Sequence, residues 1–269
     1  MGRPAGPTRL TSKKEVLAWR AAGGPTASCA MCIIAVALKR KLTLEEAENC
    51  FLSNPDGAGV AWSRGDRNYL RKGFMGLDEF IEFYEELDAL PHVVHCRAAT
   101  SGGVRPELTH PFIVDLQSPP RLEWSGKKPL LFHNGVVSKW EDLFLRFAPD
   151  IVRELRRSRK GSQIPPGPWS DTRTVAVIAA LVGEGILPFL GGKYAVLDRG
   201  RVRTYGEFVE ENGVLFSNTS YKGIRARHTK KYPYSWVPKG GVASSVAAAR
   251  FDPYEDDWWS RGLWKEERR

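Results

Sequence analysis

The first strongly hydrophobic run of the sequence covers Ala30–Leu38 (AMCIIAVAL). Its nine residues are too few for a helix that crosses a bilayer, and the basic triplet Lys39-Arg-Lys41 follows at once. A secretory signal has its apolar core close behind a short basic start, whereas some thirty residues precede this run. The run therefore predicts a buried strand of a folded domain and not a signal or a membrane span.

The composition is that of an ordinary folded domain. Of the 269 residues, 42% are hydrophobic and 26% are charged, which provides enough apolar side chains for a core. This length suits one large domain or two small ones. Four cysteines are too few for a disulfide scaffold of this size, so we expect a protein of the reducing cytoplasm with no membrane partner.

The net charge of +9 is unevenly distributed. Residues 1–30 carry five basic side chains and one acidic side chain, so this leader holds four of the nine charges. Two further basic clusters lie at Arg153–Lys160 and Lys222–Lys231. Such runs are usually solvated faces, and no nucleic-acid recognition motif accompanies them. A nucleic-acid partner is therefore the less favoured interpretation.

The order of predicted elements favours a mixed fold. Thr43-Leu-Glu-Glu46 has the pattern of a capping box and predicts a helix to about Leu52. Ser138-Lys-Trp-Glu141 predicts the cap of another helix, and a basic, proline-rich stretch follows it to Trp169. Two more helices are expected over 76–87 and 170–182, and short strands over 59–62, 68–71, 91–96, 130–133, 193–197, 201–205 and 213–216, with 109–114 leading into another. Short strands of antiparallel style mixed with a few helices predict an α+β sandwich, in which helix layers pack on sheets.

Cys32 has three interpretations. With Cys29 it forms a CxxC pair, which serves redox chemistry at a helix start or supplies half of a zinc site. Cys50 and Cys96 are isolated, so the sequence offers no second pair and we expect no metal. Otherwise Cys32 is an ordinary buried cysteine of the predicted strand. In the third interpretation Met31 is a start or a processing site, and Cys32 becomes an N-terminal nucleophile.

Three other positions favour the third interpretation. Arg97 follows a buried strand in a glycine-rich loop, where its guanidinium can bind a carboxylate in bidentate fashion. Asn134 and Gly135 end another buried strand, so a side-chain amide and a backbone N–H can point at one place, as an oxyanion site requires. Asp171 lies at the start of a predicted helix, where it either caps the helix or binds an ammonium group.

Together these residues resemble the class II glutamine amidotransferases, whose nucleophile is an N-terminal cysteine. Six segments carry the resemblance in the family's order: Met31-Cys-Ile-Ile34, Asn54-Pro-Asp-Gly-Ala-Gly59, His95-Cys-Arg-Ala-Ala-Thr-Ser-Gly102, Thr109-His-Pro-Phe112, Phe132-His-Asn-Gly135 and Ser170-Asp-Thr172. The later segment, from Gly206-Glu-Phe208 through Phe216-Ser-Asn-Thr-Ser-Tyr221, is similar to small stand-alone members of the family. Each segment alone is weakly specific, and their common order makes the resemblance specific.

The resemblance implies a four-layer αββα sandwich of the Ntn-hydrolase (N-terminal-nucleophile) type with antiparallel sheets. It implies an amidotransferase domain over residues 32–250 that needs no cofactor and no metal. Residues 1–31 are then a mobile basic leader or propeptide, and residues 251–269 an aromatic and charged tail. Because the chain has no nucleotide-binding glycine loop, we expect the ammonia to pass to a separate synthetase or ligase.

The family pattern also implies a mechanism. Cys32 attacks the side-chain amide of L-glutamine, and Asn134 with the Gly135 N–H holds the oxyanion. Ammonia leaves, and water resolves the γ-glutamyl thioester to glutamate. Arg97 binds the α-carboxylate of the substrate and Asp171 binds its α-ammonium. Thr100 and His110 are the further substrate-binding residues that this pattern assigns.

Two departures from the family pattern matter. The loop reads Arg97-Ala-Ala-Thr-Ser101 where many members have Arg-Trp-Ala-Thr-His, which changes how the loop closes over the site. In the family the α-amine of the cysteine is the general base, since this group titrates near neutrality. With 31 residues attached, the α-nitrogen of Cys32 is an amide without useful basicity, so the intact chain is expected to be nearly inactive.

Two other functions stay open at this point. One is a different Ntn amide hydrolase, which the expected pair of Arg97 and Asp171 disfavours because simple amides need no such charges. The other is a catalytically silent binding protein of the same fold, whose basic leader contacts nucleic acid. The N-terminus of the mature protein discriminates between enzyme and binding protein, because the enzyme needs a free α-amine on Cys32.

Overall fold

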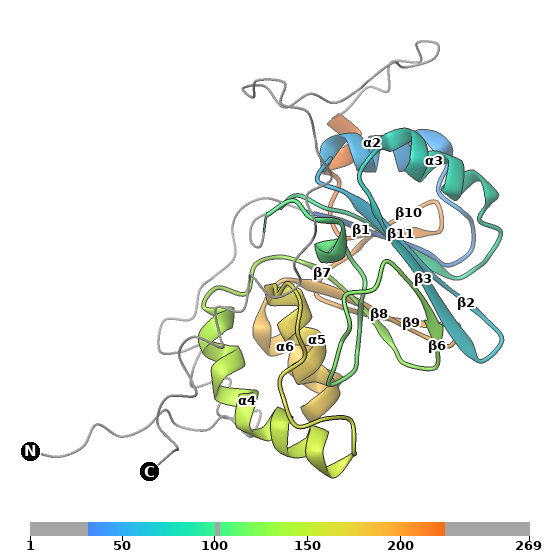
Figure 1. The fold of residues 1–269 in the computed structure, drawn as a ribbon. Helices are drawn as coiled ribbons and strands as arrows, with labels where there is room; N and C mark the ends of the chain where they lie inside the picture. The colour runs from blue at the N-terminus through green and yellow to red at the C-terminus, as the bar shows by residue number, and fades with distance from the viewer. Residues whose placement is uncertain (1–31, 100–102, 224–269) are drawn as a thin grey trace, which may run out of the picture.

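The computed structural model describes residues 32–99 and 103–223, which form two antiparallel sheets and five α-helices. Figure 1 shows both sheets in the middle of the molecule, with helices α2 and α3 above them and α4 and α5 below. The predicted α+β fold with antiparallel sheets is therefore confirmed. The leader 1–31, Thr100 and the tail 251–269 lie outside the described residues. None of the helices in the described ranges is long and apolar enough to cross a membrane.

The larger sheet has seven strands in the order β10-β11-β1-β4-β2-β3-β6. Strand β1 (Ile33–Ala37) lies near its centre, between β4 (His92–Cys96) and β11 (Val214–Phe216). The other strands are β2 (Ala58–Arg64), β3 (Arg67–Phe74), β6 (Glu123–Gly126) and β10 (Val209–Glu211). All five residues of β1 are buried, as the apolar run predicts.

The smaller sheet has four strands in the order β5-β7-β8-β9. They are β5 (Phe112–Ile113), β7 (Leu130–Asn134), β8 (Lys193–Asp198) and β9 (Arg201–Tyr205). In this sheet Asn134, the last residue of β7, pairs with Lys193, the first residue of β8. The predicted turn at 134–135 therefore lies at the end of a central strand.

Three hydrophobic cores give the layer order helix, sheet, sheet, helix. The core between the sheets includes Ile34 and Val36 of β1 together with Leu130 and Phe132 of β7. The alternate residues of β1 face the opposite way, into a core beneath α2 (Leu44–Ser53) and α3 (Leu77–Glu86). A third core joins the smaller sheet to α4 (Trp140–Arg157) and α5 (Asp171–Val182), with the short helix α6 (Leu187–Leu190) beside it.

The helix predicted at Ser138 differs from the one observed. Helix α4 begins after Lys139, whose φ of 52° is left-handed, and no side chain caps it, so the predicted capping by Ser138 is wrong. The helix also continues to Arg157, past Pro149 and into the basic cluster that was expected to follow it. Its buried face explains this length, because burying an apolar stripe outweighs one interior proline. That stripe includes Phe147, Ile151 and Leu155.

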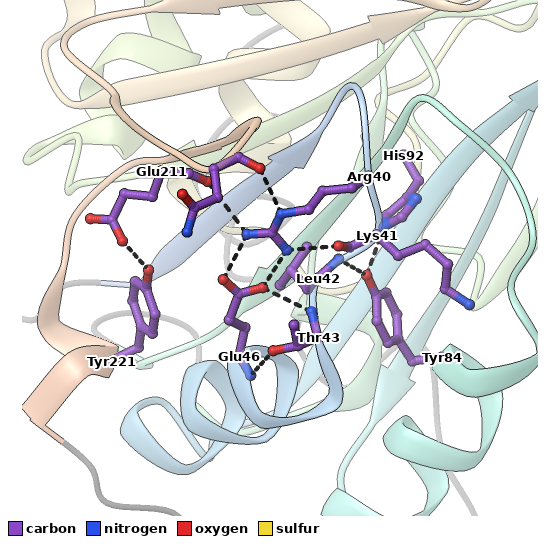
Figure 2. A network of polar contacts seen from close by, with 10 residues as sticks. Arg40, Lys41, Leu42, Thr43, Glu46, Tyr84, His92, Glu211 and Tyr221 are labelled. Atoms are coloured by element: carbon purple, nitrogen blue, oxygen red, sulfur yellow. Dashed lines mark hydrogen bonds and ion pairs between the residues drawn. The ribbon is translucent and has the colours of Figure 1, made fainter.

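A polar network ties the end of β1 to the edge of the larger sheet (Figure 2). The Arg40 guanidinium donates to both carboxylate oxygens of Glu46, at 2.6 and 2.8 Å, and to the carbonyl oxygen of Asn212 in the β10–β11 turn at 2.6 Å. The same carboxylate accepts from the Thr43 N–H at 2.8 Å, which completes the predicted capping box of α2. A bidentate arginine–carboxylate pair is directional, so this network holds the β10–β11 hairpin against β1.

Gly59 lies where β2 passes against the segment that carries His110. A Cβ atom at this position would overlap the His110 carbonyl oxygen and would lie 2.5 Å from the Lys72 Cβ. Both obstacles are close to the backbone and cannot rotate away. Only glycine therefore fits at this point, and the close approach holds the His110 segment against the larger sheet.

We expect Gly59→Ala to lower the free energy of unfolding by about 3 kcal/mol, because the overlap forces the backbone to shift. Gly185→Ala is the matched control, since nothing lies within 4 Å of a Cβ built there. The control should change stability by no more than about 0.5 kcal/mol. Urea unfolding of both variants measures the difference, and equal effects would show that Gly59 has no special role.

Candidate active site

Cys32 is the first described residue and directly precedes β1, near the centre of the larger sheet. Its side chain is buried. The N–H of Ala98 donates to the sulfur at 3.4 Å, and the thiol donates to the Ala98 carbonyl oxygen at 3.4 Å. Burial raises the pKa of the Cys32 thiol, and the Ala98 N–H and the Arg97 charge offset this only in part. The thiol is therefore protonated at neutral pH and needs a base before it can act as a nucleophile.

The loop after β4 is held by the predicted turn at 54–59. The Asp56 N–H donates to the Arg97 carbonyl oxygen at 3.0 Å, and the Arg97 N–H donates to the Gly57 carbonyl oxygen at 2.8 Å. The Asp56 carboxylate accepts from the Ala99 N–H at 2.8 Å. The Arg97 guanidinium is buried and donates to the Gly103 carbonyl oxygen at 2.7 Å. Two segments that are distant in the sequence therefore fix the arginine close to Cys32, which it influences electrostatically.

The turn after β7 needs a glycine. A Cβ on Gly135 would lie 2.8 Å from the Gly192 Cα and 2.9 Å from the His133 Nε2. The amide of Asn134 is nearly buried, and its Nδ2 donates to the Ser217 hydroxyl oxygen at 2.8 Å. One N–H of this amide is thus used inside the protein, which leaves its second N–H for another acceptor.

Asp171 is the first residue of helix α5 and not its N-cap residue. The capping side chain is Ser170, whose hydroxyl oxygen accepts from the Arg173 N–H at 3.2 Å. The Asp171 carboxylate instead accepts from the Val137 N–H at 3.1 Å and from the Thr172 N–H at 2.8 Å. Both roles that the sequence left open for Asp171 fit this geometry, because its carboxylate satisfies one free N–H at the start of its own helix and is oriented by two backbone donors.

His110 belongs to a buried hydrogen-bond chain that sequence reasoning missed. Its Nδ1 lies 2.6 Å from His95 Nε2, and its Nε2 lies 3.0 Å from the Thr172 hydroxyl oxygen. His133 Nδ1 lies 3.2 Å from the same hydroxyl, which donates to the Asp171 carboxylate at 3.3 Å. Both ring nitrogens of His110 are thus engaged, which favours a positioning role over the direct substrate contact that the resemblance implied.

The hydrogen-bond partners define the protons of this chain. A carbonyl oxygen can only accept, so His95 Nε2 carries a proton and donates to the His133 carbonyl oxygen at 3.1 Å. His110 Nδ1 then accepts from His95, and the proton of His110 is on Nε2. Because the Thr172 hydroxyl donates to Asp171, His133 Nδ1 is the donor to Thr172. The His133 Nε2 is consequently unprotonated, and it has no partner among the described residues.

Burial keeps these rings uncharged. It lowers the pKa of His95 to about 3 and that of His110 well below its ordinary value, and the positive charge of Arg97 acts in the same direction on both. Burial also lowers the pKa of His133, which Asp171 opposes. The histidine rings of this hydrogen-bond chain therefore place no positive charge beside the Asp171 carboxylate at neutral pH.

One small pocket collects the predicted site residues. Its lining residues are Cys32, Arg97, Ala98, Leu108, His110, His133, Gly135, Ser170, Asp171 and Thr172. Asn134 is not among these lining residues, although Gly135 beside it is, and Thr100 lies outside the described ranges. The volume of about 20 Å³ matches one water molecule. A ligand as large as an amino acid therefore requires the lining segments to move apart.

The remaining candidates for redox or metal chemistry give no site. Cys50 and Cys96 are buried free cysteines like Cys32, and burial raises the pKa of both thiols. Cys29 lies outside the described residues. Across the ranges 32–99 and 103–223, no three His, Cys, Asp or Glu side chains are grouped so that they can hold a metal ion.

Neither models of known protein families nor curated proteins match this sequence. The assignment of the site therefore depends on its geometry and on the order of the motifs.

The buried histidines predict an acid-sensitive fold. Burial also lowers the pKa of His92, to about 4, so the pKa values of four buried histidines lie below the ordinary value near 6.5. Below that value the unfolded chain binds more protons than the folded one. Stability is thus highest above pH 6.5 and falls as the pH is lowered, by up to about 1.4 kcal/mol per pH unit for each histidine. Urea unfolding between pH 7.5 and 5 measures this slope, and a flat profile would contradict the neutral chain.

Proposed function

We propose that this protein is a class II amidotransferase-type glutaminase, which hydrolyses L-glutamine to glutamate and ammonia with Cys32 as the nucleophile. The observation that carries the proposal is the pocket that brings together Cys32, Arg97, Gly135 and Asp171 from four separate parts of the fold. These residues provide a thiol, a cation, a backbone donor at a strand end and an anion. Attack on the side-chain amide of a free amino acid needs each of these four groups.

The architecture supports an Ntn-hydrolase-like αββα fold. Two antiparallel sheets face each other, a helix pair covers each outer face, and the candidate nucleophile begins a central strand. A fold alone does not define an activity, so the weight of the proposal rests on the pocket. We extend the proposed domain over residues 32–250, as the sequence suggests.

The charges of the pocket suit the ends of an amino acid. Arg97 would bind the α-carboxylate, because a guanidinium matches a carboxylate in geometry. Asp171 would bind the α-ammonium, since its carboxylate is oriented by two N–H groups and the histidine rings beside it are neutral. This pair favours glutamine over simple amides and so disfavours a general amide hydrolase.

The proposed reaction uses the α-amine of a chain that begins at Cys32. This amine takes the thiol proton, and the sulfur bonds to the amide carbon of glutamine. The carbonyl oxygen becomes an oxyanion that accepts from Asn134 Nδ2 and the Gly135 N–H. The amine then gives its proton to the leaving nitrogen, ammonia departs, and a thioester remains. Water attacks the thioester carbon, the C–S bond breaks, the thiol regains a proton, and glutamate leaves.

The surroundings of the sulfur support this choice of base. Within the described part of the chain, Cys32 Sγ has hydrogen-bond contacts only with the backbone of Ala98. The rings of His95 and His110 hydrogen-bond to other groups. A protonated thiol without a side-chain base needs the α-amine, which titrates at about 7.7–8.0 when it is free. We further propose that the released ammonia is used by a separate synthetase or ligase in the cytoplasm.

A chain that begins at Cys32 should release glutamate from glutamine, whereas the 269-residue chain should release almost none because its Cys32 nitrogen is an amide. Expression from Met31 yields the shorter chain once the methionine is removed, and N-terminal sequencing verifies it. A diazoketone analogue of glutamine should alkylate Cys32 and spare Cys50 and Cys96. Cys32→Ala is the matched control and should abolish both activity and labelling.

Three results would count against the glutaminase. Equal activity of the two chains would exclude the α-amine as the base. Comparable hydrolysis of simple amides would favour another Ntn amide hydrolase. Neither activity nor labelling in the shorter chain would favour the silent binding protein.

Asp171→Asn, made in the chain that begins at Cys32, should raise the KM for glutamine about 10- to 100-fold, because a charge-assisted hydrogen bond to the ammonium is lost. Hydrolysis of glutaramate, which lacks the α-ammonium, should stay nearly unchanged. Glu154→Gln, at a half-buried position of α4 that is not among the residues lining the pocket, is the control with an equal change of charge. Equal losses on both substrates would show that Asp171 does not bind the ammonium.

A further inference from the structure

Two adjacent residues that follow β11 contact the proposed oxyanion donor, Asn134, and the proposed nucleophile, Cys32. Ser217 and Asn218 leave the larger sheet where β11 ends, beside the start of β1. The Ser217 side chain is fully buried. Neither residue was predicted as a site residue, although both lie in the segment 216–221 that resembles small family members. Asn218 contacts Cys32, 186 positions away in the sequence, and Ser217 contacts Ile34, 183 positions away, so both contacts exist only through the tertiary fold.

Ser217 joins the ends of the two sheets. Its hydroxyl oxygen accepts from the Ile34 N–H of β1 at 2.9 Å and from Asn134 Nδ2 of β7 at 2.8 Å. Its own N–H donates to the Ile34 carbonyl oxygen at 2.9 Å, and its carbonyl oxygen accepts from Lys193 Nζ at 2.5 Å. Asn134 and Lys193 are partners across β7 and β8, so Ser217 binds both members of one cross-strand pair.

This contact defines the direction of the Asn134 amide. Its Nδ2 has two protons in one plane, and Ser217 accepts one of them. The direction of the second N–H is then determined by the planar amide. An oxyanion donor is effective only when it points at the developing charge before the reaction begins. Ser217 therefore meets the requirement for a residue that orients the proposed oxyanion donor.

Asn218 binds the nucleophile residue itself. Its Nδ2 donates to the Cys32 carbonyl oxygen at 2.8 Å. Its Oδ1 accepts from both the N–H and the hydroxyl of Ser220, at 3.0 and 2.7 Å. A backbone N–H can only donate, so Ser220 defines which end of the amide faces Cys32. Asn218 thus holds the backbone carbonyl of Cys32. The α-nitrogen and the sulfur that must meet in the proposed reaction belong to this same cysteine.

We infer that Ser217 and Asn218 form a positioning brace, which orients the Asn134 amide toward the oxyanion and holds Cys32 so that its α-amine reaches its own thiol. The inference rests on the proposed glutaminase function. It names two residues outside the pocket as determinants of the rate of glutamine hydrolysis. The Arg40 network holds the β10–β11 hairpin against β1 and so supports the brace from the other end of β11. The brace acts on the reacting groups and not on Arg97 or Asp171, so its loss should lower kcat and spare KM.

The test uses the chain that begins at Cys32 and its Ser217→Ala and Asn218→Leu variants. The second variant is nearly isosteric at a partly exposed position, so it carries the test if the buried Ser217→Ala fails to fold. Thr219→Ala is the matched control, because this exposed neighbouring side chain makes no hydrogen bond within the described residues. Alkylation to completion with the diazoketone analogue of glutamine gives the fraction of molecules whose folded site reacts with the analogue. Steady-state kinetics then give kcat per labelled site and KM.

We expect kcat per labelled site to fall about 10- to 100-fold in both brace variants, the size of loss that a misplaced reacting group produces. The KM for glutamine should stay within about threefold, and Thr219→Ala should match the parent chain. A variant that only unfolds loses labelled sites but keeps its kcat per site. A kcat per site within about threefold of the parent in both variants would overturn the inference. A parent chain without activity or labelling would instead overturn the proposed function, and the inference with it.

Discussion

The hydrogen-bond chain from His95 through His110 and Thr172 to Asp171 is the interaction on which the candidate site depends. Its four members come from three segments, each of which bears a candidate site residue: His95 lies two positions before Arg97, His110 is itself a candidate, and Thr172 adjoins Asp171. Inside a protein an unpaired polar group is costly, so every link of such a chain is held in its geometry. Burial keeps the rings neutral, which leaves the Asp171 carboxylate beside uncharged partners.

The two sheets explain why these segments meet. Cys32 precedes β1, Arg97 follows β4, and Asn134 ends β7, so three strand ends from two facing sheets converge on one place. The apolar core between the sheets packs the two sheets face to face and so brings these strand ends together. Ser217 and Asn218 add a polar connection between the same strand ends. The fold thereby combines a rigid apolar interior with a polar site at its rim.

Local patterns predicted the elements well where their signals were strong. The capping box at Thr43, the helix that starts after Ser170 and the buried strand at 33–37 all occur as expected. The cap at Ser138 was wrong, because α4 gains its stability from its buried face and needs no capping side chain. The short strand β10 was missed, since three residues carry too little periodicity to show.

The sequence by itself determined the class of fold, the candidate nucleophile and the chemical types in its pocket, because these depend on local periodicity and on the order of motifs. Only the tertiary structure decided which polar groups form hydrogen bonds and with which partners. It engaged both nitrogens of His110, bound the Asp171 carboxylate to the Val137 N–H, and placed Ser217 and Asn218 on Asn134 and Cys32. The physical reason is that hydrogen bonds between residues 34 to 186 positions apart leave no periodic trace in a sequence. They exist only once burial brings their donors and acceptors together.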